Sequence, residues 1–263
     1  MPRFFSLLAV ILTALLSTAC PAQTAATNTA RIAARLPHDA SAFTQGLLFY
    51  DGALFESTGK YGHSRLRRVN PDTGAIDRQI SLPRRYFGEG LARVDDRLFW
   101  LTWRAGRAFV LDANTFEQLG TRRYDGEGWG LTYDGHHLIM SDGSATLRVL
   151  DPADFTVVRR IDVHDHDRAV DKLNELEYID GEIWANIWYS DRIARIDPDS
   201  GDVVAWLDAR ALRDAVAGSD DINVLNGIAW DAEGERVYLT GKYWPTLFII
   251  ERPGREASTG EAR

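Results

Sequence analysis

Short apolar segments separated by polar turns recur along the chain from Phe43 onward. Each recurring unit opens with a polar or aromatic residue followed by Gly-Leu or its equivalent, and continues through a tight turn, an apolar segment, a loop and an alternating segment. Short apolar or alternating segments bounded by turn residues predict β-strands. Asp-Gly and related pairs suit the turn of a β-hairpin. Such turns join the first two strands of the units at Asp51-Gly52, Asp95-Asp96, Asp134-Gly135, Asp180-Gly181 and Glu233-Gly234.

Two further sets of strands follow these turns. The second strands are predicted at residues 54–57, 98–101, 138–141, 183–187 and 237–240. The third strands are predicted at residues 66–69, 108–111, 146–150, 193–196 and 247–250. The first four of these third strands run into turns that lead to a fourth strand, so each complete unit is expected to hold four antiparallel strands.

The units are nearly equal in length. Their opening residues are Gln45, Glu89, Trp129, Asn174 and Asn226, which are 44, 40, 45 and 52 positions apart. A period of about 40 to 45 residues is typical of a four-stranded propeller blade. The last and longest spacing contains residues 208–216, whose Asp start and content of Ala, Leu and Arg predict a short inserted helix.

The two ends of the repeat array complement each other. Residues 31–36 alternate in polarity, end at Pro37 and have no hairpin partner nearby, whereas the fifth unit stops after its third strand. Pairing of these two segments would close the ring and remove the exposed strand edges of an open array. The sequence therefore predicts an all-β, five-bladed β-propeller over residues 30–253, with the last blade completed by the N-terminal strand. A β-sandwich fits five near-equal repeats poorly.

Residues 1–20 have the layout of a secretory signal, with Arg3 before an apolar run at 4–16 and small residues after it. Cys20 is the only cysteine, and it stands where a bacterial lipoprotein signal places the cysteine that receives the lipid. The sequence fits either a lipid anchor at Cys20 or cleavage near Ala22 or Ala26. Residues 21–29 are predicted to form a tether and residues 254–263 a disordered tail. We expect an exported, periplasmic protein without a transmembrane span.

Hydrophobic content and net charge indicate what kind of molecule the protein binds. The chain is 45% hydrophobic, which is enough for a full core, and its net charge of −8 argues against nucleic acid or an anionic membrane surface as the main partner. A single cysteine forms no disulfide within the fold, so packing alone must stabilise it. We expect a monomer that acts on a small molecule or a peptide.

The starts of the first strands in a propeller form a ring at one mouth of the central channel. Here that ring is predicted to hold the five opening residues named above. A second set, after the second strands, should face the same mouth: Lys60, Trp103, Asp142, Trp188 and Lys242. Glu89 lies between two glycines, which allow close approach of a ligand. Aromatic neighbours would raise the pKa of Glu89 toward a range useful for acid-base chemistry. The alternative is that Glu89 forms a structural ion pair.

The remaining tryptophans, asparagines and acidic segments are interpreted mainly as structural. We expect Trp100, Trp184, Trp206 and Trp230 to fill the core, whereas Trp103, Trp129 and Trp188 interrupt the apolar pattern and are expected at the pocket. Asn174 and Asn226 are alternatively loop caps. The segment 164–167, His-Asp-His-Asp, has ligand-type side chains but is interpreted as a solvated loop, and residues 197–201 lack the length of a calcium loop. No cofactor and no metal are predicted.

Several of these motifs closely resemble the glutaminyl-peptide cyclotransferases of the plant and bacterial type. The similarity extends over about residues 42–245 and includes long, ordered motifs. They are Phe43-Thr44-Gln45-Gly46-Leu47, Phe87-Gly88-Glu89-Gly90-Leu91, Glu127-Gly128-Trp129-Gly130-Leu131 and residues 173–178, 184–188 and 225–229. The family is a five-bladed propeller, in agreement with the repeat count.

The resemblance implies conversion of an N-terminal glutamine of a peptide to pyroglutamate with loss of ammonia. It implies that Glu89 is the proton-transfer residue, acting as general base and then as general acid. The matching positions for substrate binding are Phe43, Gln45, Phe87, Trp103, Trp129, Asn174, Trp188 and Lys242. Of these, Gln45, Asn174 and Lys242 are expected to donate to the γ-carbonyl oxygen, and the aromatic residues to hold the side chain in a curled shape.

Two other functions use a similar framework. In a calcium-dependent lactonase-like propeller, Glu89, Asp142, Asn174 and Asn226 would hold a metal ion, but such sites need a ring richer in carboxylates. A non-catalytic propeller that binds a protein partner would have a polar or filled channel mouth without a lone, desolvated carboxylate.

Overall fold

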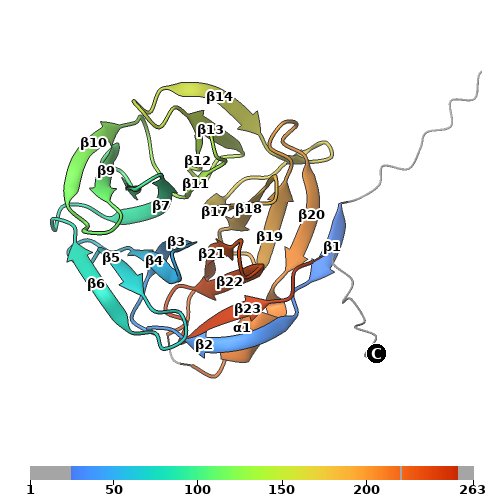
Figure 1. The fold of residues 1–263 in the computed structure, drawn as a ribbon. Helices are drawn as coiled ribbons and strands as arrows, with labels where there is room; N and C mark the ends of the chain where they lie inside the picture. Colours follow the sequence, from blue (N-terminus) through green and yellow to red (C-terminus); the bar gives the residue numbers. More distant parts are fainter. Residues whose placement is uncertain (1–24, 220, 254–263) are drawn as a thin grey trace, which may run out of the picture.

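The computed structural model describes residues 25–219 and 221–253, and it confirms the predicted five-bladed propeller (Figure 1). Each blade is a twisted antiparallel sheet of four strands, and the blades surround a central axis. The predicted signal segment at residues 1–20, the first part of the tether and the tail at residues 254–263 lie outside the described residues. Within the described part of the chain, no helix is both long and apolar enough to cross a membrane.

The first four blades follow one another along the chain. Blade 1 is β3 (Thr44–Tyr50), β4 (Ala53–Thr58), β5 (Arg65–Val69) and β6 (Ile76–Ser81). Blade 2 is β7 (Gly88–Val94), β8 (Arg97–Thr102), β9 (Arg107–Asp112) and β10 (Gln118–Arg123). Blade 3 is β11 (Leu131–Tyr133), β12 (Leu138–Met140), β13 (Thr146–Leu150) and β14 (Val157–Asp162). Blade 4 is β17 (Leu173–Ile179), β18 (Glu182–Ile187), β19 (Arg192–Ile196) and β20 (Val203–Asp208).

Blade 5 joins the two ends of the repeat array, as the sequence predicted. It consists of β21 (Leu225–Asp231), β22 (Arg236–Gly241), β23 (Thr246–Ile250) and the N-terminal strand β2 (Ile32–Pro37). Strand β2 pairs antiparallel with β23, with Ile32 opposite Ile250 and Leu36 opposite Leu247. The ring is therefore closed by hydrogen bonds between residues about two hundred positions apart in sequence.

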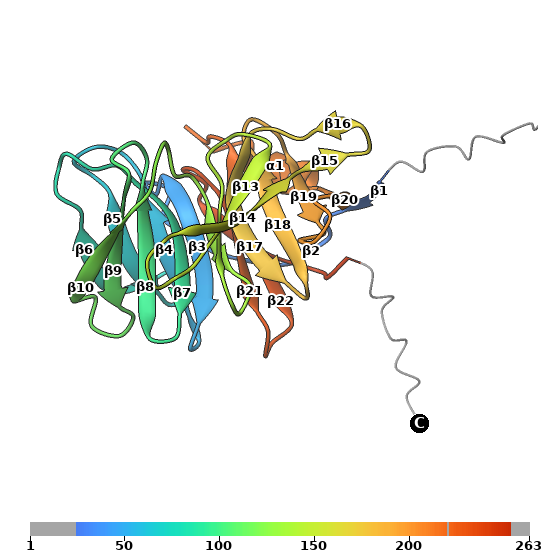
Figure 2. The ribbon, with the colours of Figure 1, turned by 90° about the horizontal axis from the view of Figure 1, so that it is seen from above.

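Part of the predicted tether is instead a strand. β1 (Ala26–Thr29) runs parallel to β20 and adds a fifth strand to the sheet of blade 4, a position visible in Figures 1 and 2. The segment Ala-Thr-Asn-Thr has no apolar alternation of its own. Its structure comes from the free edge of β20, which offers unpaired backbone groups, so the local sequence pattern could not predict it.

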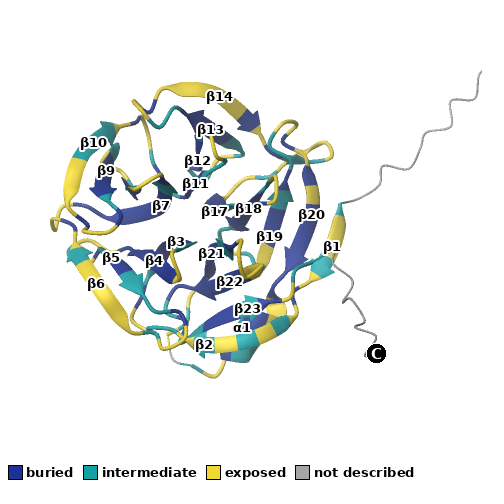
Figure 3. Cartoon of the chain, in the orientation of Figure 1, coloured by how far each residue is buried: buried dark blue, intermediate teal, exposed yellow. Residues whose placement is uncertain are grey.

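Burial follows the order of the strands within each blade. The first strands, nearest the axis, are almost completely buried, whereas the outer strands β6 and β14 are mostly exposed (Figure 3). The buried apolar residues form five clusters, and each cluster fills one of the five interfaces between neighbouring blades. Three of the expected core tryptophans, Trp100, Trp184 and Trp206, lie within these clusters, and Trp230 packs against one of them. The core is thus a ring of blade interfaces around the axis.

Two connections between blades carry additional structure. The predicted helix is present as α1 (Arg210–Val216), and its Leu212 and Val216 pack into the cluster between blades 4 and 5. The N-cap residue is Ala209 and not Asp208, although the Asp208 carboxylate accepts the backbone N–H of Arg210 at 3.1 Å and binds the Arg210 guanidinium. The segment after blade 3 forms a small hairpin of β15 (His164–Asp165) and β16 (Arg168–Ala169).

Candidate active site

One pocket, of roughly 240 Å³, lies at a mouth of the propeller, and its lining combines three indoles, two phenyl rings, two amides, two ammonium groups and one carboxylate. These side chains come from the starts of the first strands, from the residues just before them and from the loops after the second strands. The lining residues are Phe43, Gln45, Lys60, Phe87, Glu89, Trp103, Trp129, Asn174, Trp188 and Lys242. The structure therefore brings together all nine residues that the resemblance assigned to the site, together with Lys60, which was expected at the same mouth.

The blades present these side chains through a repeated hydrogen bond. In blades 2, 4 and 5 the backbone N–H after the second strand donates to the carbonyl oxygen two residues before the ring position. The pairs are Trp103 to Phe87, Trp188 to Lys172 and Lys242 to Val224, each at 2.9 Å. In blade 1 the equivalent donor is Gly59, which bonds to Phe43 at 2.8 Å. Gly59 therefore occupies the position equivalent to Trp103 and Trp188, and Lys60, one residue later, lines the pocket as expected.

Glycine is required at position 59 because the pocket wall passes directly over it. A Cβ atom there would lie 2.3 Å from Cε1 of Phe87, which is far inside van der Waals contact. Gly59, which stands in blade 1 where blades 2 and 4 have tryptophan, thus makes room for the Phe87 ring. A sequence alignment of the repeats by residue type alone does not show this contact.

Glu89 is 4% exposed and stands on the first residues of β7. The Gln45 side-chain amide donates to its carboxylate at 2.8 Å. Burial raises the pKa of Glu89 well above its ordinary value, Lys242 and Gln45 oppose that shift, and Glu127 adds to it. The carboxyl group therefore holds a proton at a pH where an exposed glutamate has lost it.

The backbone around Glu89 is fixed from both neighbouring sides. The Ser57 hydroxyl donates to the carbonyl oxygen of Glu89, and the Gly90 N–H donates to the carbonyl oxygen of Trp129 in the next blade at 2.6 Å. The Trp100 indole N–H donates in turn to the Ser57 oxygen at 2.6 Å. The backbone that carries the Glu89 side chain therefore cannot move away from the pocket without breaking buried hydrogen bonds.

Lys242 supplies a buried positive charge on the same pocket. Its pKa is lowered to about 8, mainly by burial and also by a second ammonium group, Lys60, while Glu89 opposes the shift. The Nζ atom of Lys242 lies 4.8 Å from the centre of the Phe43 ring, and that of Lys60 lies 3.9 Å from it. Both ammonium groups thus gain a cation–π contact on one phenyl ring.

Glu127 positions two of the indoles and was not among the predicted site residues. It accepts hydrogen bonds from the indole N–H groups of Trp103 at 2.7 Å and Trp129 at 2.9 Å, and from the Arg104 guanidinium at 2.9 Å. These donors hold the pKa of Glu127 below its ordinary value despite partial burial. Its place two residues before Trp129 in a matching motif was the only sign of this role in the sequence.

Two residues expected at the channel mouth, one from each set, do not line the pocket. The Asn226 side chain is completely buried and donates to the Thr44 carbonyl oxygen at 2.9 Å. Asp142 pairs with Arg148 at 3.2 Å and accepts the Ser144 hydroxyl. Of the four residues that would hold calcium in a lactonase-like site, only Glu89 and Asn174 therefore line the pocket, and this geometry disfavours the lactonase alternative.

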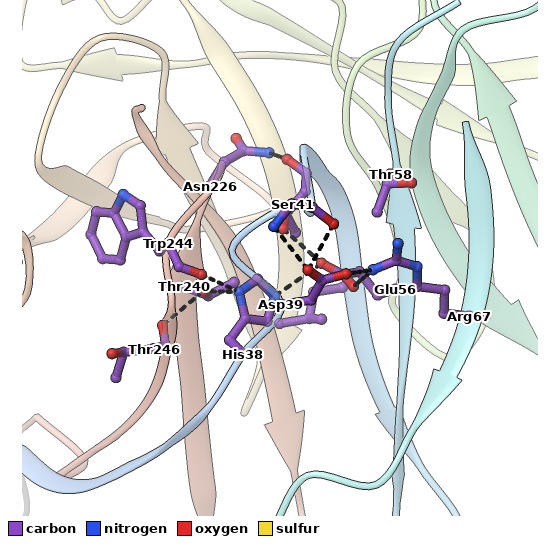
Figure 4. A network of polar contacts seen from close by, with 12 residues as sticks. His38, Asp39, Ser41, Glu56, Thr58, Arg67, Asn226, Thr240, Trp244 and Thr246 are labelled. Atoms are coloured by element: carbon purple, nitrogen blue, oxygen red, sulfur yellow. Dashed lines mark hydrogen bonds and ion pairs between the residues drawn. The ribbon is translucent and has the colours of Figure 1, made fainter. Parts of the chain in front are cut away.

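A polar network joins blades 5 and 1 at the seam where the ring closes (Figure 4). His38 bonds to the Trp244 carbonyl oxygen at 2.6 Å and to the Glu56 carboxylate at 3.0 Å. Burial opposes the charged imidazolium, but Glu56 outweighs this effect and raises the pKa of His38. Glu56 also accepts the Thr44 hydroxyl at 2.7 Å. The network holds Thr44, and with it the neighbouring pocket residues Phe43 and Gln45.

The histidine-rich segment has structural partners. His164 pairs with Asp202 at 3.0 Å, and Asp165 accepts the Trp206 indole N–H at 2.9 Å. Across residues 25–219 and 221–253, no group of three or more His, Cys, Asp and Glu side chains has an arrangement suited to a metal ion.

Known proteins resemble this chain over nearly the whole repeat array. Residues 6–251 match the family model described as glutamine cyclotransferase. The glutaminyl-peptide cyclotransferase of Arabidopsis thaliana is 41% identical over 237 residues, which are 89% of this chain and 74% of that relative. The crystal structure of Myxococcus xanthus glutaminyl cyclase matches with a TM-score of 0.82 at 39% identity, covering 86% of this chain and 97% of that one.

Proposed function

The chain belongs to the glutamine cyclotransferase family, and we propose that it converts N-terminal glutamine of peptides and proteins to pyroglutamate with release of ammonia. The observation that carries the site assignment is the lone buried carboxylate of Glu89 in a pocket of aromatic, amide and ammonium groups. No nucleic acid or cofactor enters this proposal.

The reaction is an intramolecular acyl transfer. The neutral α-amine attacks the γ-amide carbon, and a C–N bond forms while the carbonyl oxygen gains negative charge. Glu89 takes one proton from the attacking nitrogen and delivers it to the amide nitrogen, which leaves as ammonia as the C–N bond to it breaks. Atoms and charge balance, and the same carboxylate is restored. Positioned proton transfer of this kind contributes about 10² to 10⁴ in rate.

The raised pKa of Glu89 suits both halves of this cycle. An α-amine has a pKa of about 7.7 to 8.0. Burial moves the Glu89 pKa upward from its ordinary value, which is the direction toward that of the amine. A smaller difference in pKa makes proton uptake from the amine less unfavourable, and the acid formed is a suitable donor to the leaving nitrogen.

Lys242, Gln45 and Asn174 are the proposed partners of the carbonyl oxygen. All three line the pocket with Glu89 and are buried. Donors that are already oriented in a dry site stabilise developing charge without reorganising. The Trp129 and Trp188 rings meet edge to face at 5.3 Å and the Phe87 and Trp103 rings at 5.5 Å. These rings would restrict the glutamine side chain to a curled conformation close to attack.

Metal independence, export to the periplasm, the monomeric state and a lipid anchor at Cys20 are further proposals. The first is supported by the chemistry of the pocket lining, which contains one carboxylate and no histidine or cysteine. The signal layout of residues 1–20 supports export. Fractionation of cells and mass spectrometry of the mature N-terminus test export and lipidation.

Ammonia release from a short peptide beginning with glutamine tests the activity. The purified protein should release one equivalent of ammonia per peptide in the presence of excess chelator, and the product should lose the mass of one NH₃. A folded protein that leaves the peptide unchanged would contradict the proposed activity. A peptide beginning with asparagine is the substrate control, because its shorter side chain cannot form the five-membered lactam.

A further inference from the structure

Exposed aromatic side chains gather at the rim of the pocket. The exposed large apolar residues of the described chain include two tyrosines, Tyr61 and Tyr189, which are 52% and 71% exposed. Each packs against a ring that lines the pocket: Tyr61 lies 5.4 Å from Phe87, and Tyr189 lies 4.5 Å from Trp188. The other exposed members are aliphatic and lie on the outer strands, far along each blade from the axis: Ile76, Leu119, Val157, Val158 and Val204.

Tyr189 occupies a backbone conformation that does not favour tyrosine. It follows the pocket residue Trp188 in a turn closed by the Ser190 N–H donating to the Ile187 carbonyl oxygen at 2.9 Å. Its φ of 64° is left-handed, a region in which glycine and asparagine are favoured and other residues are strained by about 1 to 2 kcal/mol. The equivalent Tyr243 of blade 5 has the same conformation, with a φ of 63°. The left-handed turn is therefore a feature of the repeat, and what distinguishes Tyr189 is that its ring is 71% exposed and contributes little to the core.

The size of the pocket determines where the rest of a peptide substrate lies. A volume of roughly 240 Å³ is below the range of about 300 to 1,000 Å³ of pockets that enclose drug-sized ligands. The pocket therefore accommodates one glutamine residue, and the next residue of the peptide must leave through the mouth. The side chain of that next residue passes the rim, where the flat face of Tyr189 is available.

We propose that Tyr189 is a specificity-determining residue that binds the side chain of the residue following the N-terminal glutamine, favouring aromatic side chains over glycine. This inference rests on the proposed cyclotransferase activity. Tyr189 packs on Trp188, so the substrate ring would extend a stack that begins at the pocket wall. Offset or edge contacts between aromatic rings add specific attraction beyond the area that they bury.

Two peptides that differ only at the second residue test this inference. For Gln-Phe-Ala and Gln-Gly-Ala, the wild-type protein should show a kcat/KM ratio of about three to ten in favour of phenylalanine, an effect of the size that one aromatic contact supplies. In Tyr189→Asn the ratio should fall to about one, mainly through a higher KM for Gln-Phe-Ala. Asparagine tolerates left-handed backbone, so the melting temperature should stay the same or rise.

Leu119→Ala is the matched control, because it removes another exposed apolar side chain, on β10 of blade 2. It should keep the wild-type ratio. A wild-type ratio near one, or an unchanged ratio in Tyr189→Asn, would overturn the inference. A uniform loss for both peptides would leave the ratio unchanged and so would show that Tyr189 only supports Trp188. Absence of cyclisation of both peptides by the wild-type protein would instead contradict the proposed activity itself.

Discussion

At the scale of single residues, the pocket shifts the pKa values of a carboxyl group and an ammonium group in opposite directions. Burial raises the pKa of Glu89 well above its ordinary value and lowers that of Lys242 to about 8. The α-amine of the substrate has a pKa of about 7.7 to 8.0, close to that of Lys242. Activity should therefore rise with pH as the carboxyl group and the amine lose their protons. It should fall as Lys242 loses its positive charge near pH 8.

Lys242→Met tests the descending side of this profile. Removing a donor to the developing oxyanion should lower kcat by about 10². The descent above pH 8 should also disappear, because methionine does not titrate. The measurement is kcat against pH from 6 to 10 with a peptide beginning with glutamine.

Lys172→Met is the control for this variant, since Lys172 is exposed and does not line the pocket. It should keep both the rate and the descent. A Lys242→Met protein that retains the wild-type descent would show that another group titrates there.

At the scale of elements, glycines in the first strands let the blades approach one another at the axis. Gly46, Gly90 and Gly130 each follow a ring residue, and a Cβ on any of them would lie within 2.7 Å of the backbone of the next blade. The closest approach is at Gly130, where that atom would lie 2.0 Å from the carbonyl oxygen of Asn174. Packing at the axis and placement of the pocket amide therefore depend on the same contact.

Gly130→Ala should accordingly lower both stability and activity. Overpacking of a close backbone contact typically costs about 1 to 3 kcal/mol, and the displaced Asn174 should reduce kcat. Thermal unfolding and ammonia release are the measurements. Gly218→Ala is the control, because no atom lies within 4 Å of an added Cβ there and its φ is not left-handed, and both quantities should stay near the wild-type values.

The sequence predicted the elements that have a pattern of their own. Turn residues and apolar periodicity located the strands of the blades. For β2, alternation predicted the strand, and the missing fourth strand of the fifth unit predicted its partner. Strand β1 was missed because its pairing comes from β20 and not from its own pattern. Glu127 was missed as a residue that positions indoles, since its contacts with Trp103 and Arg104 exist only after the blades have folded together.

At the scale of the whole molecule, one blade departs from the glycine pattern at the axis. Blade 4 has Glu175 where the other blades have glycine. Its buried carboxylate accepts the N–H of Ile228 in blade 5 at 2.8 Å and of Leu47 in blade 1 at 3.2 Å. Blades 4 and 1 are not neighbours in the ring, so this side chain crosses the central channel. Glu177, two residues later, accepts the N–H of Trp230 at 2.9 Å.

These axial carboxyl groups should make the propeller less stable at alkaline pH. Burial raises the pKa of Glu177 from its ordinary value to about 8, and that of Glu175 in the same direction. Between an ordinary pKa near 4.5 and the folded value of about 8, the folded state keeps a proton that the unfolded chain has lost. The contribution is therefore complete below the unfolded pKa, and it is lost as pH rises through the folded value, at up to about 1.4 kcal/mol per pH unit for one group.

Glu177→Gln should flatten this dependence. The free energy of unfolding, measured in denaturant from pH 5 to 8.5, should fall less steeply with pH than in the wild-type protein, by up to about 1.4 kcal/mol per unit. Glu117→Gln, at an exposed position, should leave the slope unchanged. A wild-type slope in the Glu177→Gln protein would place the titration elsewhere in the structure.

The proposed cyclisation depends on proton transfer by Glu89, and glutamine at this position removes the proton acceptor while keeping the shape of the side chain. We would compare ammonia release from a peptide beginning with glutamine by the wild-type, Glu89→Gln and Glu117→Gln proteins, all with excess chelator. Glu89→Gln should fold as the wild-type protein does, by its melting temperature, and lose at least about 10² in kcat, while Glu117→Gln should turn over normally. A folded Glu89→Gln protein with wild-type turnover would contradict the assignment.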